Sequence, residues 1–210
     1  MSLILRSWQP PDRGALFVVS GASGTGKTTL VKEALRRMPH VRFSVSVTTR
    51  PARSGEVDGR DYHFVTADEF ARMVDDDALL EWAEVYGNRY GTPRAPVEDA
   101  LARGESVLLD IDVQGARQVR RHMPEAVTIF ILPPDMATIE ARLRGRSTDS
   151  EAVIARRMAQ ARQQLQGAAE ADYLVVNDDL ETAHDVLQAI IVAELSRRQR
   201  RASLAARFSS

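Results

Sequence analysis

The sequence predicts an α/β protein built on a parallel sheet with helices on both sides. Four apolar runs have the length and β-branched content of strands that are buried on both faces, and helical patterns alternate with them. This alternation is typical of parallel strand–helix–strand units. The expected strands span residues 15–20, 107–112, 127–132 and 173–177.

Helical segments are expected between these strands, because apolar residues recur there at spacings of three and four. The first helix should begin near Lys27 and end before Pro39. The remaining helices are expected at about 97–103, 114–122, 135–144, 154–165 and 180–195.

The pattern changes between the first helix and residue 107. Short alternating segments there surround one helix that opens with a capping box, Thr66 with Glu69. We therefore expect a small mixed α/β insertion within the core. The predicted division is 14–45 and 93–200 for the core, 46–92 for the insertion, about 144–152 for an arginine-rich lid, and 1–13 and 201–210 for flexible tails.

Composition excludes several classes of protein. The chain has 210 residues, of which 44% are apolar, and this is enough for one core. With 28 basic and 29 acidic residues the net charge is −1, which argues against a protein that coats nucleic acid or an anionic membrane. The absence of cysteine, of a signal-peptide core and of a membrane-spanning run favours a cytoplasmic location.

A phosphate-binding motif follows the first expected strand. The segment GASGTGKT matches G-x-x-x-x-G-K-[ST] and lies between an expected strand and an expected helix. Its glycines let backbone N–H groups face phosphate oxygens, Lys27 adds a positive charge, and the Thr28 hydroxyl can bind Mg²⁺. A glycine-rich turn without a ligand is the alternative. The predicted ATP-binding residues of this loop are Gly21, Ala22, Ser23, Gly24, Thr25, Gly26, Lys27, Thr28 and Thr29.

A second candidate anion site lies at residues 46–62, SVTTRPARSGEVDGRDY. Arg50 and Arg53 can each offer paired donors to a monophosphate, and Tyr62 and Tyr90 can add phenolic donors. A kinase for small molecules needs such a site opposite the nucleotide phosphates. By itself, however, the arginine pair is better explained by a solvated surface loop.

Five segments together resemble the guanylate kinase family, whose members phosphorylate GMP with ATP. The segments GASGTGKTTL, FSVSVTTRPARSGEVDGRDYHFV, LLEWAEVYGNRYGTP, LLDIDVQGARQV and VVNDDL occur in the order of the family, and the similarity extends from about Gly14 to Leu195. The resemblance implies a P-loop NTPase-type parallel sheet flanked by helices, with a small mixed α/β GMP-binding insertion and a short lid.

The resemblance also implies the residues that hold the acceptor. Those at the GMP phosphate would be Arg50, Arg53, Tyr62 and Tyr90. Glu81 lies where a carboxylate accepts hydrogen bonds from guanine N1–H and the 2-amino group, which adenine cannot provide. Without the resemblance, Glu81 would be interpreted as a surface or interface carboxylate. Base recognition would be completed by Ser46, Thr92 and Asp112.

On the ATP side, the resemblance implies that arginines close over the phosphates and that Asn177 lies near the adenine. Asp110 ends an expected strand and is the better candidate for a carboxylate that orients Mg²⁺ through water. The division of roles between Asp110 and Asp112 stays open, since both can be loop caps. The arginines are Arg142, Arg146 and Arg157, and the residues implied in catalysis are Lys27, Arg50, Asp110, Arg146 and Arg157.

The expected function is therefore transfer of the γ-phosphate of MgATP to GMP, and to dGMP as well, by a protein whose oligomeric state the sequence leaves undetermined. One alternative is a non-catalytic guanylate-kinase-like module that binds phosphopeptides; the complete Gly26-Lys27-Thr28 motif argues against it. The other is a P-loop kinase for a sugar phosphate such as ribose 1,5-bisphosphate, which would not need Glu81 and Thr92 in this setting.

Overall fold

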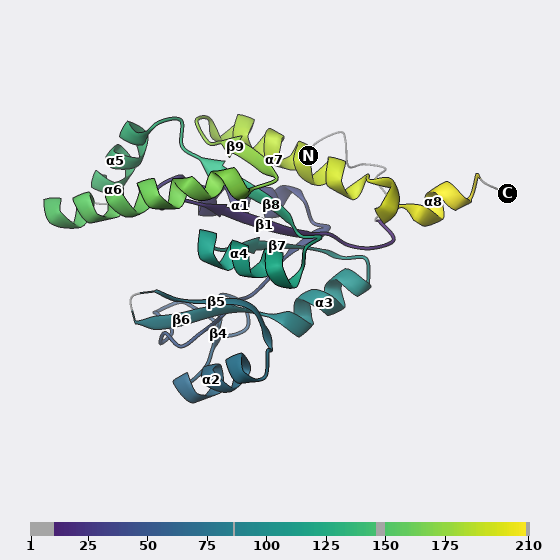
Figure 1. The fold of residues 1–210 in the computed structure, drawn as a ribbon, viewed down its shortest axis with the longest axis horizontal. Coiled ribbons are helices and arrows are strands. Elements are labelled where there is room, and N and C mark those ends of the chain that lie inside the picture. Colours follow the sequence, from purple (N-terminus) through teal and green to yellow (C-terminus); the bar gives the residue numbers. More distant parts are fainter. Residues whose placement is uncertain (1–10, 86, 146–149, 209–210) are drawn as a thin grey trace.

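A computed structural model describes residues 11–85, 87–145 and 150–208 (Figure 1). It confirms an α/β fold with a five-stranded parallel sheet of order β2-β7-β1-β8-β9. The strands are β1 (Leu16–Gly21), β2 (Val41–Phe43), β7 (Ser106–Asp110), β8 (Val127–Leu132) and β9 (Tyr173–Val176).

The central strand β1 is buried on both faces, which explains its unbroken apolar sequence. Phe17 and Val19 pack on one face with α1 (Lys27–Arg37) and α7 (Leu180–Leu195). Leu16 and Val18 pack on the other face with α3 (Arg94–Ala102) and α4 (Val113–His122). A separate cluster joins α5 (Met136–Arg144) to α6 (Glu151–Leu165), beside Ala22 of the phosphate-binding motif.

A smaller mixed sheet of order β4-β3-β6-β5 lies beyond α4 (Figure 1). Its helix α2 (Ala67–Asp75) packs through Phe70 against Val47 and Leu79. The Thr66–Glu69 capping box predicted for this helix is confirmed. The strands are β3 (Val47–Thr48), β4 (His63–Phe64), β5 (Leu79–Val85) and β6 (Asn88–Pro93).

Three features differ from the sequence-based expectations. Strand β2 was not expected in the large sheet, because three residues give too short a pattern to recognise. The strand predicted at 173–177 is not buried on both faces: Val175 packs in the cluster with α1 and α7, whereas Leu174 is 52% and Val176 is 51% exposed on the opposite face of this edge strand. Helix α3 begins at Arg94, earlier than expected, because Pro96 is tolerated in a first helical turn.

The end of the chain, for which fraying was expected, contains two short helices, η3 (Arg198–Arg200) and α8 (Ala202–Ala206). Arg200 Nη1 donates to the carbonyl of Gly14 at 2.9 Å, and the Ser203 N–H donates to Asp12 Oδ2 at 2.7 Å. These bonds attach the C-terminal segment to the start of the core. Across the described residues, no helix is long and apolar enough to cross a membrane.

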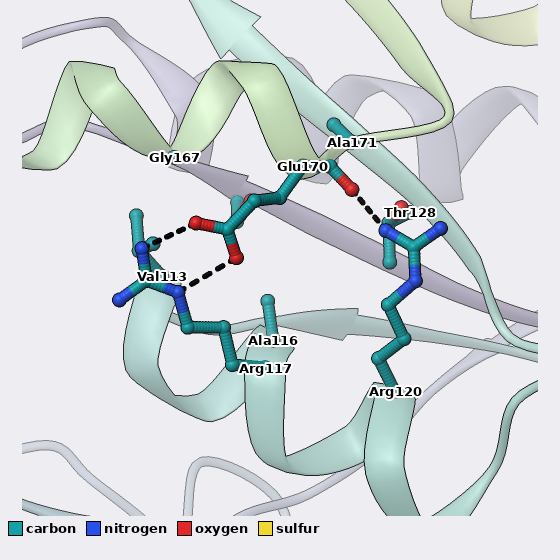
Figure 2. Close-up of a pocket in the computed structure, with 9 residues that line it drawn as sticks. Val113, Ala116, Arg117, Arg120, Thr128, Gly167, Glu170 and Ala171 are labelled. Atoms are coloured by element: carbon teal, nitrogen blue, oxygen red, sulfur yellow. Dashed lines mark hydrogen bonds and ion pairs between the residues drawn. The ribbon is translucent and has the colours of Figure 1, made fainter.

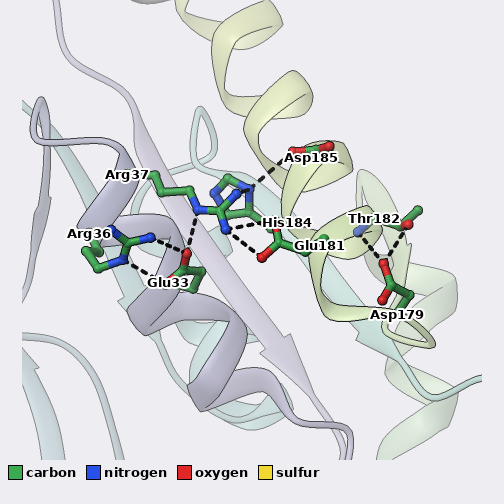
Figure 3. Close-up of polar contacts among 8 residues, drawn as sticks. All are labelled: Glu33, Arg36, Arg37, Asp179, Glu181, Thr182, His184 and Asp185. Atoms are coloured by element: carbon green, nitrogen blue, oxygen red, sulfur yellow. Dashed lines mark hydrogen bonds and ion pairs between the residues drawn. The ribbon is translucent and has the colours of Figure 1, made fainter. Parts of the chain in front are cut away.

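A polar cluster joins α1 to α7 (Figure 3). Arg37 of α1 binds both carboxylate oxygens of Glu181 at 2.6 and 2.8 Å, and it also bonds to Glu33 at 2.5 Å. Its Nη1 lies 3.3 Å from Nδ1 of the buried His184, so that nitrogen accepts the hydrogen bond. The cluster fixes the C-terminal end of the helix that begins at the phosphate-binding motif.

A second network joins α4 to the segment before β9 (Figure 2). Arg117 makes two hydrogen bonds, of 2.7 and 2.5 Å, to Glu170 in η2 (Gln166–Glu170), and Arg120 bonds to Asp172 at 2.9 Å. Asp172 also accepts the N–H and hydroxyl of Thr128 at 2.8 and 2.6 Å. Burial raises the pKa of Asp172, but the hydrogen bonds from Thr128 and the charge of Arg120 outweigh it and hold the pKa below its usual value.

We expect Asp172→Ala to lower the free energy of unfolding by about 1–2 kcal/mol, because Thr128 and Arg120 lose an ionised hydrogen-bond acceptor. The effect is no larger because water partly screens the charge of Asp172. A depressed carboxyl pKa stabilises the fold above the usual Asp pKa, and this contribution is lost as the pH falls through the folded value. The difference from wild type should therefore shrink in acid. Urea unfolding at neutral and acidic pH measures it.

The matched control is Asp99→Ala, which removes an exposed carboxylate from α3. Its effect should stay within about 0.5 kcal/mol, as for most surface substitutions. Equal destabilisation by the two variants, or a difference that does not depend on pH, would contradict the role given to Asp172.

Candidate functional site

The loop between β1 and α1 has a backbone that suits an anion. Gly24 and Gly26 have φ angles of 88° and 82°, in the left-handed region that favours glycine. Gly26 is the N-cap of α1, and no described side chain caps the helix there. The first N–H groups of α1 and the positive end of the helix dipole therefore face the loop.

Two residues from other elements hold this loop. The buried Asn177, just after β9, donates Nδ2–H to the carbonyl of Thr25 at 2.7 Å. Arg142 of α5 donates to the carbonyls of Gly24 and Thr25 at 3.3 and 3.1 Å. A Cβ on Gly26 would lie 2.5 Å from Asn177 Nδ2, so this close approach also requires glycine. Both predicted ATP contacts thus bind the backbone of the phosphate-binding motif.

The sheet register brings Asp110 to the same place. Strand β7 pairs with β1 so that Asp110 lies opposite Val19, and the carboxyl ends of parallel strands share one edge. Lys27 Nζ contacts Asp110 Oδ1 and donates to the carbonyl of Ile111 at 3.2 Å. Thr28 Oγ1 donates to Asp110 Oδ2 at 3.3 Å.

Charge and burial act in opposite directions on Lys27. Burial lowers its pKa to about 8, while the negative charge of Asp112 raises it. The ammonium group is therefore mostly protonated at neutral pH. Asp112 itself caps α4, accepting the N–H of Gly115 at 2.8 Å, so the loop-cap interpretation applies to this acid.

The arginine segment after β3 is organised by an acid. Arg50 Nη2 donates to Glu56 Oε1 at 2.8 Å, and the Arg53 N–H donates to Glu56 Oε2 at 2.7 Å. The guanidinium carbon of Arg50 lies 5.4 Å from the centre of the Tyr62 ring. The hydrogen bond from Arg50 and that from Arg53 lower the pKa of Glu56, so its carboxylate stays ionised.

The structure brings together three of the four predicted phosphate ligands. The Tyr62 and Tyr90 rings meet nearly edge to face with centres 6.0 Å apart, beside Arg50. Burial, reinforced by Tyr90, raises the pKa of Tyr62, so its phenol keeps the proton that it can donate. The Arg53 side chain is exposed, and its guanidinium has no hydrogen bond to any described residue.

Glu81 is buried, at 5% exposure, and is not a surface carboxylate. Thr92 Oγ1 donates to Glu81 Oε1 at 2.7 Å across the β5–β6 pair. Burial raises the pKa of Glu81 to about 7; the bond from Thr92 opposes this shift, and the charge of Asp112 adds to it. A Cβ on Gly115 would lie 2.5 Å from Glu81 Oε2, so α4 closes the other side.

One cleft of about 470 Å³ joins the two anion sites. Thr28 of the phosphate-binding motif and Asp110 at the end of β7 line it, together with Ser46, Glu56 and Tyr62 of the arginine segment. A ligand held at one site can therefore reach the other. Its wall also includes Val31, Lys32, Leu35, Phe43, Arg60 and Asp61.

Two predicted arginines remain outside this geometry. Arg146 lies outside the described residues, as does the middle of the expected lid: of the range 144–152, the positions 146–149 are not described. Arg157 lies half-buried on α6.

Among the described residues, no group of three or more His, Asp or Glu side chains is placed to bind a metal ion on its own.

The sequence analysis missed three residues of the site. Glu56 organises both arginines, Gly115 contacts the Glu81 carboxylate, and Gln164 of α6 accepts the Ser23 N–H at 3.0 Å. Glu56 stands inside the quoted arginine segment, and a glycine within a helical pattern is itself a signal of close packing. Gln164 carries no such signal, because its partner is 141 positions away.

Comparisons with known proteins agree on one family. Residues 13–194 match the family model described as guanylate kinase. Curated guanylate kinases include one from Synechocystis sp., 54% identical over 89% of this chain and 97% of its own, and one from Bradyrhizobium diazoefficiens, 52% identical over 91% and 88%. The crystal structure of guanylate kinase from Anaplasma phagocytophilum is 34% identical, with a TM-score of 0.77 over 96% of this chain and 97% of that chain. The chain belongs to the guanylate kinase family.

Proposed function

We propose that this protein transfers the γ-phosphate of MgATP to GMP, and also to dGMP, giving ADP and the nucleoside diphosphate. The observation that carries the proposal is the single cleft that Thr28 and Asp110 share with Ser46 and Tyr62. Membership of the guanylate kinase family supports the same reaction. In this proposal residues 46–92 hold GMP, and the segment at about 144–152 is a lid.

On the ATP side, the N–H groups at the start of α1 and the Lys27 ammonium would bind the β- and γ-phosphates. Lys27 would then exchange its contact with Asp110 for phosphate oxygens. Asn177 and Arg142 would keep the loop in its binding conformation, and Arg146 and Arg157 would approach the phosphates from the lid and α6. Positioning and neutralising charge account for most of the catalysis of phosphoryl transfer.

The residues present fit a magnesium ion. The Thr28 hydroxyl and an Asp110 carboxylate oxygen lie 3.3 Å apart at the sheet edge, and Mg²⁺ usually takes one or two protein oxygens together with phosphates and waters. Thr28 would bind the ion directly and Asp110 through water. When bound, the ion would supply positive charge that neutralises the negative charge developing during phosphoryl transfer.

On the acceptor side, Arg50, Arg53, Tyr62 and Tyr90 would hold the GMP phosphate. Glu56 holds Arg50 in place through one oxygen. The exposed Arg53 side chain has the freedom to close on the phosphate from solvent. A phosphate oxygen of GMP is already an ionised nucleophile, so the reaction needs no general base.

Guanine would lie against Glu81, with Ser46, Thr92 and Asp112 around it. The buried carboxylate would accept hydrogen bonds from guanine N1–H and the 2-amino group. In AMP, N1 is itself an acceptor and would face the negative charge without a hydrogen bond, which strongly disfavours AMP. A sugar phosphate such as ribose 1,5-bisphosphate, or a phosphopeptide, would leave Glu81 without a partner. The buried Glu81 carboxylate therefore favours GMP over both alternatives.

The direct test is ADP release from MgATP by the purified protein. GMP, dGMP, AMP, UMP and ribose 1,5-bisphosphate are offered in separate reactions, with a reaction lacking acceptor as the blank. We expect turnover with the two guanine nucleotides only. Turnover confined to the sugar phosphate, or none above the blank, would refute the proposed function.

Lys27→Ala should abolish turnover while leaving the fold intact, because the side chain supplies charge to the phosphates and belongs to no apolar cluster. The rate of ADP release and the thermal unfolding midpoint are measured together. Arg36→Ala, which removes an exposed cation from the last turn of α1 at a position that does not line the cleft, is the matched comparison and should retain turnover. Near-normal activity of Lys27→Ala would exclude the assignment.

Glu81→Gln should lower kcat/KM for GMP by about 10²–10⁴-fold, since two hydrogen bonds to a charged acceptor are lost or reversed.

In the wild type only about a tenth of Glu81 is ionised one pH unit below its pKa of about 7, so KM for GMP should rise as the pH falls through that value. Thr92 and Asp112 are the polar groups that face Glu81.

The GMP phosphate also titrates, near pH 6, and this affects both enzymes alike. The difference between the pH profiles of wild type and Glu81→Gln therefore isolates Glu81. If the two profiles are parallel, Glu81 does not bind the base in its ionised form.

A further inference from the structure

Strand β5, which carries Glu81, is the edge strand of the four-stranded sheet. One side of β5 pairs with β6, and the other side faces α4 (Figure 1). An edge strand presents backbone N–H and C=O groups that have no strand partner. In this structure, side chains of α4 bind those groups.

Gln118 acts as a substitute for a neighbouring strand. Its Oε1 accepts the Trp82 N–H at 3.1 Å, and its Nε2 donates to the Trp82 carbonyl at 2.8 Å. A primary amide has the same donor and acceptor as a peptide group, so one side chain satisfies both backbone groups of Trp82. No strand is needed on this side of β5 at that residue.

His122 makes a similar contact one residue before Glu81. Its Nδ1 lies 2.7 Å from the Leu80 carbonyl, and a carbonyl can only accept, so Nδ1 is the donor. The β5–β6 register is irregular between Leu79 and Glu81, which places Leu80 at a bulge. A bulge redirects neighbouring side chains and leaves a residue out of the ladder.

These contacts enclose Glu81 from three sides. Gln118 holds the residue after it, His122 holds the residue before it, and Gly115 lies against its carboxylate. Positions 115, 118 and 122 are three and four residues apart and so lie on one face of a helix. Helix α4 begins directly after Asp112, so the same rigid element also reaches the sheet edge where Asp110 lies.

We propose that Gln118 is a positioning residue for acceptor recognition: its amide fixes β5 so that the Glu81 carboxylate meets the Watson–Crick edge of guanine. The inference deepens the proposed function and rests on it. Gln118 does not touch the base. It acts through the backbone of Trp82, because a binding group must be held to within about 0.5 Å to be effective.

The test uses Gln118→Met, which keeps the length of the side chain and removes both hydrogen bonds. Gly115→Ala is the second variant: its Cβ would displace the Glu81 carboxylate, yet alanine favours the helix, so the protein should still fold. The matched control is Gln199→Met, the same change at an exposed position of η3, in the C-terminal segment. Each is assayed as the full chain, with KM and kcat for GMP, AMP and ATP.

For Gln118→Met we expect KM for GMP to rise about 10-fold and the preference for GMP over AMP to fall by a similar factor, as befits two lost neutral hydrogen bonds. KM for ATP should change less than about twofold, because the phosphate-binding motif lies on the large sheet. Gly115→Ala should show the same pattern without a lower thermal midpoint. Gln199→Met should match the wild type.

A pH profile distinguishes a Gln118 that positions the Glu81 carboxylate from one that only stabilises β5. If β5 moves outward, Glu81 gains water, and the acid limb of kcat/KM for GMP should shift to lower pH. Among the described residues, the other charged or titratable groups with contacts close to this part of β5 are Asp112, His122, Arg89 and Arg94. The variants alter none of them. The shift would therefore belong to Glu81.

The outcomes are separable. A wild-type protein that phosphorylates no guanine nucleotide overturns the proposed function, and this inference with it. An active wild type whose Gln118→Met variant keeps its KM for GMP, its preference over AMP and its pH profile overturns the inference alone, even if the thermal midpoint falls. An equal rise in KM for ATP also overturns it.

Discussion

The parallel pairing of β1 with β7 is the constraint on which the site depends. It places the carboxyl end of β7, with Asp110, beside the start of the phosphate-binding motif, although Lys27 and Asp110 are 83 positions apart in sequence. The helices that follow the two strands, α1 and α4, then begin at the same edge. The first N–H groups of α1 face the loop of the motif, and α4 extends to Glu81.

Burying Glu81 opposes stability, and the proposed role of its carboxylate in binding the base gives a reason for that cost. The shift of its pKa from 4.5 to about 7 corresponds to roughly 3 kcal/mol against the ionised form. A raised carboxyl pKa means that the folded state holds the proton more tightly, so folding becomes less favourable as the pH rises from the unfolded value to the folded one. Hydrogen bonds from Thr92 offset this cost only in part. A ligand with two adjacent hydrogen-bond donors would offset the free-energy cost of ionising Glu81. A site that is destabilised when empty favours a ligand that removes the destabilisation.

Sequence reasoning predicted the parts whose cause is local. The first strand, the glycine-rich turn and the Thr66 capping box depend on residues close in the chain, and all are present. Strand β2, the exposed face of β9 and the burial of Glu81 depend on which elements become neighbours. The contact of Gln118 with Trp82 joins residues 36 positions apart, and a glutamine in an amphipathic helix gives no sign of it.

The two cations at the centre of the anion sites are already paired with carboxylates. Lys27 contacts Asp110, and Arg50 contacts Glu56, so neither cation is an uncompensated buried charge in the free protein. A phosphate must therefore compete with a carboxylate for the same donors. A singly charged anion has little advantage in that exchange, whereas a terminal phosphate brings more charge and more acceptor oxygens. In the proposed function, the pairing would hold both cations in place and would bias the two candidate anion sites toward phosphate esters over the carboxylates and small anions of the surrounding solution.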